Sequence, residues 1–222
     1  MFEKADRTVQ ALWEDKIWWD ERKRNGITDE DLAKWAALQC YGLSHAISEF
    51  HNFQKAGSDK DPKTKGLHCD IKPDNIFHYE QWKAAPNSTP NDTVDERLGI
   101  LQLNDFGLST FHSAASVDDK RVRGGILEYM APETEFLLNH SPASDVWHLG
   151  CFFMDLATWL VEGPEGYERF RDERGTKGLR MNIARFATFS EDQKSGYTYV
   201  TVNQRVLKVR ICNMVARGIL GC

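Results

Sequence analysis

Apolar and polar residues follow a helical period through residues 26–53 of this 222-residue chain. Thr28 stands where a helix N-cap is expected, and three acidic residues follow it in the first turn, where the helix dipole favours negative charge. The pattern predicts one long amphipathic helix, and a shorter helical pattern precedes it over residues 8–24. The apolar positions that we expect on the inner face of the long helix are Leu32, Trp35, Ala36, Tyr41, Leu43, Ile47 and Phe50.

Two short apolar runs further along the chain are typical of strands. They are residues 75–79 (NIFHY) and 98–105 (LGILQLND). Residues 80–97 between them are rich in Pro, Asn, Asp and Ser, which favour turns on protein surfaces. The two runs are therefore predicted to pair as a small β ribbon whose connection is a surface excursion.

The second half of the chain begins with an irregular stretch, residues 105–133, and then becomes strongly apolar. Residues 144–163 are apolar on nearly every side, which predicts a buried helix, and residues 165–186 have the pattern of a more exposed one. The fold class predicted is mainly α with a small β ribbon. With 41% hydrophobic residues, the chain can bury one good core, so we expect one compact unit.

Charge and cysteine content exclude several classes of function. The net charge of −5 is spread along the chain, so no basic surface indicates nucleic acid or anionic lipid. The five cysteines lie far apart and in no CxxC pair, which favours a reducing compartment without structural zinc. The longest apolar run, residues 149–161, contains Asp155 and is too short to span a membrane. We expect an intracellular protein, cytoplasmic or nuclear, and the oligomeric state is left open.

The polar stretch HCDIKPDNIF, residues 68–77, lies beside the predicted ribbon. Asp70 and Asn75 share this loop, and Asp105 follows the second strand, so strand pairing would bring the three together. Carboxylate and carboxamide oxygens suit Mg²⁺, which takes few protein ligands and completes its shell with water and phosphate. Asp70 would then orient a hydroxyl nucleophile, and Lys72 would neutralise a phosphoryl group during its transfer.

Four motifs in this order, HCDIKPDN, DFG, APE and SDVWHLG, resemble the C-terminal lobe of a eukaryotic protein kinase. The resemblance covers residues 2–163 and implies a serine/threonine kinase that uses ATP and Mg²⁺ to phosphorylate a protein substrate. It implies that Asp70 is the catalytic aspartate and that Lys72 faces the transferred phosphate. It also implies that Asn75 and Asp105 hold Mg²⁺, and that ATP is bound by Lys72, Asn75, Asp105 and Phe77, with Phe77 beneath the adenine.

The same resemblance assigns structural tasks to other residues. It implies that His68 packs against Phe106, that Glu133 anchors the activation segment, and that Asp145 holds the backbone of the catalytic loop. Cys69 is expected to be a small packed residue. The tryptophans at positions 13, 18 and 19 are expected to pack between helices.

Several features differ from the family pattern. Residues 1–6 are similar to the hinge between kinase lobes, and no glycine-rich loop or strand lysine precedes them in this chain. We therefore expect one kinase-like domain over residues 1–222 that holds the C-terminal lobe alone, with an atypical tail at 164–222. Cys69 stands where many kinases have arginine, and residues 117–130 contain no Ser or Thr. This predicts an activation segment that is ordered without phosphorylation. Ile126 replaces a threonine typical of Ser/Thr kinases.

Three functional hypotheses follow. The first is a serine/threonine kinase whose catalytic loop is intact but which is inactive as this chain alone, because nothing in it clamps the ATP phosphates. The second is a non-catalytic, kinase-like binding module. The third, much weaker, is an unrelated metal-dependent hydrolase that uses Asp70 and Asp105.

Overall fold

A computed structural model describes seven stretches of the chain, which are residues 4–53, 65–80, 97–112, 128–137, 140–174, 187–191 and 198–202. The helices are α1 (Val9–Glu14), α2 (Lys16–Arg24), α3 (Asp29–His51), α4 (Pro132–Leu137) and α5 (Pro142–Arg174), with short 3₁₀ helices η1 (Pro73–Asn75) and η2 (Phe106–Leu108). The strands are β1 (Arg7–Thr8), β2 (Lys65–Leu67), β3 (Ile76–Tyr79), β4 (Ile100–Leu103), β5 (Thr110–His112), β6 (Ala187–Glu191) and β7 (Thr198–Val202).

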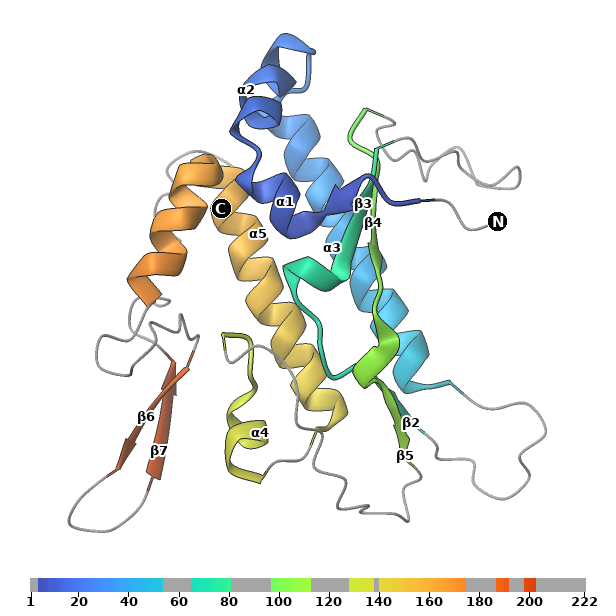
Figure 1. The fold of residues 1–222 in the computed structure, drawn as a ribbon, viewed down its shortest axis with the longest axis vertical. Coiled ribbons are helices and arrows are strands. Elements are labelled where there is room, and N and C mark those ends of the chain that lie inside the picture. Colours follow the sequence, from blue (N-terminus) through green and yellow to red (C-terminus); the bar gives the residue numbers. More distant parts are fainter. Residues whose placement is uncertain are drawn as a thin grey trace.

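The described residues are mostly helical with small antiparallel sheets, as the sequence predicts. Strands β1, β3 and β4 form one sheet in that order, β2 pairs with β5, and β6 pairs with β7. Helix α5 packs against α3 and α1, and α3 also contacts β4. Figure 1 shows α5 running between the β3–β4 ribbon on one side and β6–β7 on the other. The predicted pairing of β3 with β4 is therefore correct, and β4 lies against helix α3.

The core contains several fully buried aromatic side chains. Trp13 stacks on Phe152 with ring centroids 5.3 Å apart. The Trp159 ring is stacked with that of Trp18, with centroids 5.8 Å apart, and is contacted edge-on by Trp19, with centroids 4.8 Å apart. Trp13, Phe152 and Trp159 are each 0% exposed. Burying a large apolar side chain stabilises a fold by roughly 1.5–3 kcal/mol. The tryptophans therefore join α1 and α2 to α5, in agreement with the predicted packing role.

Helix α3 begins as predicted. The Thr28 hydroxyl accepts a hydrogen bond from the Asp31 backbone N–H at 3.1 Å, and the Asp31 carboxylate accepts one from the Thr28 N–H at 2.9 Å. This reciprocal arrangement satisfies two backbone donors that a helix start leaves unpaired. The predicted inner position of Tyr41 is wrong, because that side chain is 70% exposed. Gln39 is buried instead, and its Oε1 accepts from the Leu101 N–H of β4 at 2.8 Å.

One predicted helix is divided in the structure, and one predicted break between helices is confirmed. Residues 8–24 form two helices, because Asp15 leaves the helical conformation and its carboxylate accepts from the Trp18 N–H at 2.9 Å, starting α2. The break predicted between the helices over 144–163 and 165–186 is present, because the backbone of α5 is not helical at Gly163 (φ 74°) and α5 kinks there before Pro164. Residues 175–186 lie outside the described part of the chain. Within the described part, no helix combines the length and apolarity needed to cross a membrane.

Candidate active site

The β3–β4 ribbon brings the ends of two polar loops together. The register pairs Ile76, at the start of β3, with Leu103, at the end of β4. One residue further out, the Asn104 backbone N–H donates to the Asn75 carbonyl at 2.8 Å. The loop before β3 and the turn after β4 therefore meet at one end of the ribbon, as the sequence predicts.

Asp70, Lys72 and Asn75 form one hydrogen-bonded set on the loop before β3. Lys72 Nζ donates to Asp70 Oδ2 at 2.6 Å, and Asn75 Nδ2 donates to the same oxygen at 2.7 Å. Asn75 Nδ2 also donates to the Asp70 carbonyl at 2.9 Å. Asp70 and Asn75 are only 7% and 6% exposed. Charge-assisted bonds in a buried loop hold the carboxylate in one orientation.

Among the described residues, two side-chain oxygens of this set accept no hydrogen bond: Asp70 Oδ1 and Asn75 Oδ1. Both side-chain donors use Asp70 Oδ2, so among the described residues Oδ1 accepts no hydrogen bond and is open to a hydroxyl. The Asn75 amide nitrogen is occupied by its two bonds to Asp70. Its oxygen Oδ1 is therefore the atom that Asn75 offers to a cation.

Asp105 lies beside this set but does not share its hydrogen bonds. Its backbone is left-handed (φ 57°, ψ 76°), and its carboxylate accepts from the Gly107 N–H at 3.1 Å at the start of η2. The side chain is exposed. The structure therefore joins Asp105 to Asn75 through the neighbouring Asn104 backbone, while its carboxylate is bonded within its own turn.

The donor set fits a magnesium ion that takes most of its ligands from elsewhere. Asn75 and Asp105 offer hard oxygens, which Mg²⁺ prefers. Within the described ranges there is no group of three or more His, Cys, Asp or Glu side chains that could hold a metal. The two residues could therefore hold Mg²⁺ only together with water and phosphate oxygens.

His68 is a buried structural residue. Its Nε2 bonds the Asn104 carbonyl at 3.1 Å, and its ring packs edge-on against Phe106 with centroids 4.9 Å apart, the contact that the family resemblance implies. Its Nδ1 accepts from the Asp70 N–H at 3.4 Å. Burial lowers the pKa of His68, so the ring is neutral at pH 7 and links the two loops.

Asp145 on α5 holds the backbone of the loop before β3. Its Oδ2 accepts from the His68 N–H and its Oδ1 from the Cys69 N–H, each at 2.9 Å. Cys69 has a left-handed backbone (φ 67°), which is unfavourable for a residue with a side chain. The two bonds from a carboxylate that is 1% exposed maintain this conformation. The contact implied by the resemblance is present.

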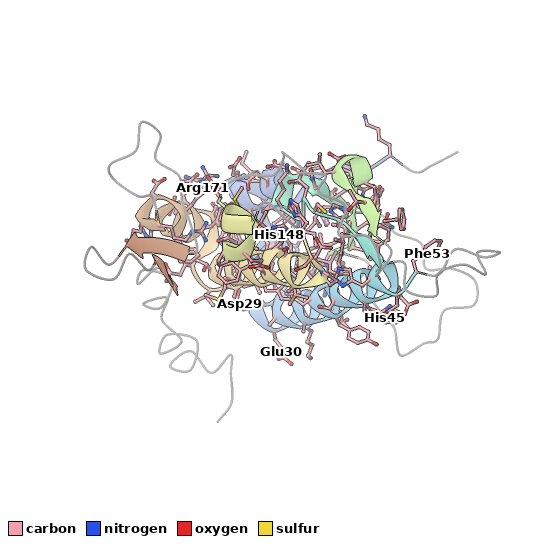
Figure 2. The ribbon with its side chains drawn as sticks, turned by 90° about the horizontal axis from the view of Figure 1, so that it is seen from below. Asp29, Glu30, His45, Phe53, His148 and Arg171 are labelled. Atoms are coloured by element: carbon pink, nitrogen blue, oxygen red, sulfur yellow. The ribbon has the colours of Figure 1, made fainter. Side chains whose placement is uncertain are left out.

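Sequence reasoning missed two histidines around that carboxylate. His51, at the end of α3, places Nε2 2.9 Å from Asp145 Oδ2. His148, one turn further along α5, places Nδ1 4.0 Å from Asp145 Oδ1 and is 4% exposed. Figure 2 shows His148 near the centre of the molecule. The pairing of His51 with Asp145 spans 94 residues, and no local pattern marks it.

Four further residues were singled out by the sequence: Cys69, Glu133, Phe77 and Ile126. Burial raises the pKa of the Cys69 thiol to about 12, which agrees with a packed and unreactive residue. Glu133 accepts from the Ser144 hydroxyl at 3.1 Å, which ties the start of α4 to α5. Phe77 is half-buried in β3 opposite Thr8. Ile126 lies outside the described residues.

A protein kinase domain model matches residues 63–200. A probable serine/threonine-protein kinase nek2 of Dictyostelium discoideum is 31% identical over 137 residues, which is 62% of this chain and 26% of that protein. Mitogen-activated protein kinase kinase kinase 3 of Arabidopsis thaliana is 33% identical over 81 residues, 36% of this chain and 12% of that protein.

The chain is also similar to a kinase named for dual specificity. The dual specificity tyrosine-phosphorylation-regulated kinase mbk-2 of Caenorhabditis elegans is 29% identical over 98 residues, 43% of this chain and 9% of that protein. The chain spans about a quarter or less of the length of these curated relatives.

Proposed function

The chain belongs to the protein kinase superfamily, and on that premise we propose that it transfers the γ-phosphate of ATP to serine or threonine of a protein substrate. The observation that carries the proposal is the buried set formed by Asp70, Lys72 and Asn75. It combines an oriented carboxylate, a cation and an amide oxygen at the point where the two loops meet. Phosphoryl transfer depends on such positioning and charge stabilisation more than on covalent chemistry.

Each residue has a separate task in this proposal. Asp70 accepts the hydrogen bond of the acceptor hydroxyl on its open oxygen and takes its proton as the oxygen attacks phosphorus. Lys72, held at 2.6 Å from Asp70, stabilises negative charge on the transferred group. Asn75 and Asp105 would hold Mg²⁺, which when bound neutralises the phosphate charge. Phe77 would contact the adenine ring from β3.

We further propose that the described elements correspond to the C-terminal lobe, and that a polypeptide limited to residues 1–222 is a poor catalyst by itself. An apolar groove of about 630 Å³ lies between α3 and β4. Phe106, which lines it, is 52% exposed. Such a face next to the site suits a covering segment that would also clamp the phosphates. Without that clamp, much of the roughly 7–11 kcal/mol available from orientation is lost.

The test is transfer of radiolabelled phosphate from ATP to mixed peptides that contain Ser, Thr or Tyr acceptors. It compares residues 1–222 with the longest natural product of the gene, and each with its Asp70→Asn variant. We expect transfer to Ser and Thr by the longer protein, a loss of roughly 10²–10⁴-fold in Asp70→Asn, the range for removing a general base, and little transfer by residues 1–222. Asp172→Asn, at an exposed position on α5, is the matched control.

Two outcomes would reject parts of the proposal. If the longer protein binds nucleotide or protein but transfers no phosphate, the chain is a non-catalytic, kinase-like binding module. If Asp70→Asn retains normal turnover, the assignment of the base is wrong. Equal labelling of Tyr and Ser would show dual specificity.

A further inference from the structure

A second buried polar cluster lies away from the catalytic loop and joins three distant parts of the chain. The Tyr129 hydroxyl donates to Asp155 Oδ2, and Arg174 Nη1 donates to Asp155 Oδ1. A second guanidinium nitrogen, Nη2, lies 3.4 Å from Asp155 Oδ2. The Asp155 and Arg174 side chains are both 0% exposed. The carboxylate is thus shared between one cation and one hydroxyl.

The cation comes from beyond the kink of α5. Arg174 is 19 residues from Asp155 and reaches it after the helix has changed direction at Gly163. Its guanidinium also lies over the Phe170 ring at 4.3 Å. A buried carboxylate without a partner is strongly unfavourable. Burial raises the pKa of Asp155, and the Arg174 guanidinium opposes that shift and so stabilises the charged carboxylate beside Tyr129.

The hydroxyl belongs to the segment, residues 128–131, that directly precedes α4. Glu128, next to Tyr129, is within electrostatic reach of both Arg174 and Asp74, a residue of η1. Ala131 is 0% exposed, and its carbonyl accepts from the Thr134 N–H at 3.0 Å at the start of α4. Residues 128–131 are therefore within electrostatic reach of the loop that carries the proposed base, and they lead directly into the helix that begins at Pro132.

We propose that Arg174 is a positioning residue for the protein acceptor, acting through Asp155 on the Tyr129 hydroxyl to hold residues 128–131 beside the catalytic loop. The acceptor part of this inference rests on the proposed kinase function, whereas the holding of the segment does not. Arg174 touches neither nucleotide nor acceptor in this scheme. Its effect is on the shape of the surface that the acceptor meets.

The first measurement is hydrogen–deuterium exchange of residues 128–134, followed by mass spectrometry of peptides from the whole chain. Tyr129→Phe removes only the hydroxyl, Arg174→Met removes the charge at similar size, and Arg174→Lys retains the charge. We expect exchange of this segment to accelerate about threefold to tenfold in Tyr129→Phe and Arg174→Met, the range for one lost hydrogen bond, and less in Arg174→Lys.

The matched control is Tyr167→Phe. Tyr167 is another tyrosine of the core, 2% exposed, and its hydroxyl donates to Gln10 Oε1 on α1 at 2.9 Å. Its loss should leave exchange at 128–134 unchanged. If Arg174→Met does not fold, Tyr129→Phe and Arg174→Lys still decide the question. Equal acceleration in Tyr167→Phe, or no acceleration in Tyr129→Phe, would overturn the proposal.

The second measurement separates positioning of the acceptor from general stability. In the longest active product of the gene, Tyr129→Phe and Arg174→Met should raise the acceptor-peptide KM by the same threefold to tenfold factor, while the ATP KM stays constant. An unchanged acceptor KM in an active protein would overturn the acceptor role. Accelerated exchange in a protein that transfers no phosphate at all would reject the proposed kinase function and support the holding of the segment.

Discussion

Two loops meet at one end of the β3–β4 ribbon, and each contains a non-glycine residue with a left-handed backbone. Cys69 (φ 67°) is buried and is held by the Asp145 carboxylate on α5. Asp105 (φ 57°) is exposed and is held by the hydrogen bond that its own carboxylate accepts from the Gly107 N–H. The same unfavourable conformation is thus maintained by the core in one loop and by a local turn in the other.

This difference separates two tasks of the proposed site. The loop with Asp70 is organised before any ligand arrives, because α5 and the ribbon hold its backbone and side chains. The turn with Asp105 offers a carboxylate whose present partner is a single backbone N–H, so a cation can replace that partner at little cost. We infer that the side of the proposed base is preformed and that bound Mg²⁺ and nucleotide complete the other side.

The largest effect is expected from Asp145→Ala. The substitution leaves the buried N–H groups of His68 and Cys69 without an acceptor and removes the partner of His51. We expect the free energy of unfolding to fall by about 3–5 kcal/mol, measured by urea denaturation. Asp172→Ala, at an exposed position of α5, should change it by less than about 0.5 kcal/mol. A loss below about 1 kcal/mol in Asp145→Ala would show that the loop does not depend on this carboxylate.

The next largest effect is expected from acid, which should lower the free energy of unfolding through buried histidines such as His68, in the loop of Asp70. Burial lowers the pKa of His68, His78 and His148, that of His148 from 6.5 to about 4. Between those values the unfolded chain binds protons that the folded chain does not. The stability contributed by these histidines is therefore fully present above about pH 7 and falls as the pH decreases toward 4, by roughly 3 kcal/mol for His148 alone.

Unfolding free energies measured from pH 7.5 to 4.5 test this dependence. His148→Gln should flatten the decline, because the ring that gains a proton on unfolding is gone. His45→Gln is the control, since His45 is exposed on α3 and lies at the margin of the molecule in Figure 2. A slope that is the same in His148→Gln and wild type would contradict the assignment.

The smallest effect on stability is expected from Asp105→Ala, in the turn after β4. Its exposed carboxylate makes one local hydrogen bond, so the free energy of unfolding should change by less than about 1 kcal/mol. Calorimetric titration should show weak Mg²⁺ binding to the wild type alone, stronger binding with ATP, and loss of that gain in Asp105→Ala. Tight Mg²⁺ binding without nucleotide would contradict the account of an incomplete site.

Local signals in the sequence predict many of the helices and strands around the site. The start of α3 follows from Thr28 and Asp31, and the ribbon follows from two apolar runs separated by turn residues. Tyr41 was misplaced because it lies on the opposite side of the helix from Leu43 and Ile47, and polar Gln39 takes a buried position through its bond to β4. The break at Asp15 depends on competition between a side chain and the helix backbone for one N–H.

Long-range partners are the part that the sequence does not reveal. The motifs indicate which residues form the two loops, but not that His51 reaches Asp145 or that Arg174 reaches Asp155. These contacts depend on where α3 and the kinked α5 lie in the packed core. The exposed position of the Asp105 carboxylate likewise follows from the η2 turn, which no spacing in the sequence specifies.

The most direct test of the difference between the loops is hydrogen–deuterium exchange at residues 68–75 and 105–109, without and with Mg²⁺ and a non-hydrolysable ATP analogue. We predict slow exchange at residues 68–75 in both conditions, because buried acceptors already hold their N–H groups. We predict fast exchange at residues 105–109 that slows several-fold only when nucleotide and Mg²⁺ are both present. Equally fast exchange of both loops without ligand, or protection that appears first in the loop of Asp70 when ligand binds, would contradict a preformed base side and a ligand-completed metal side.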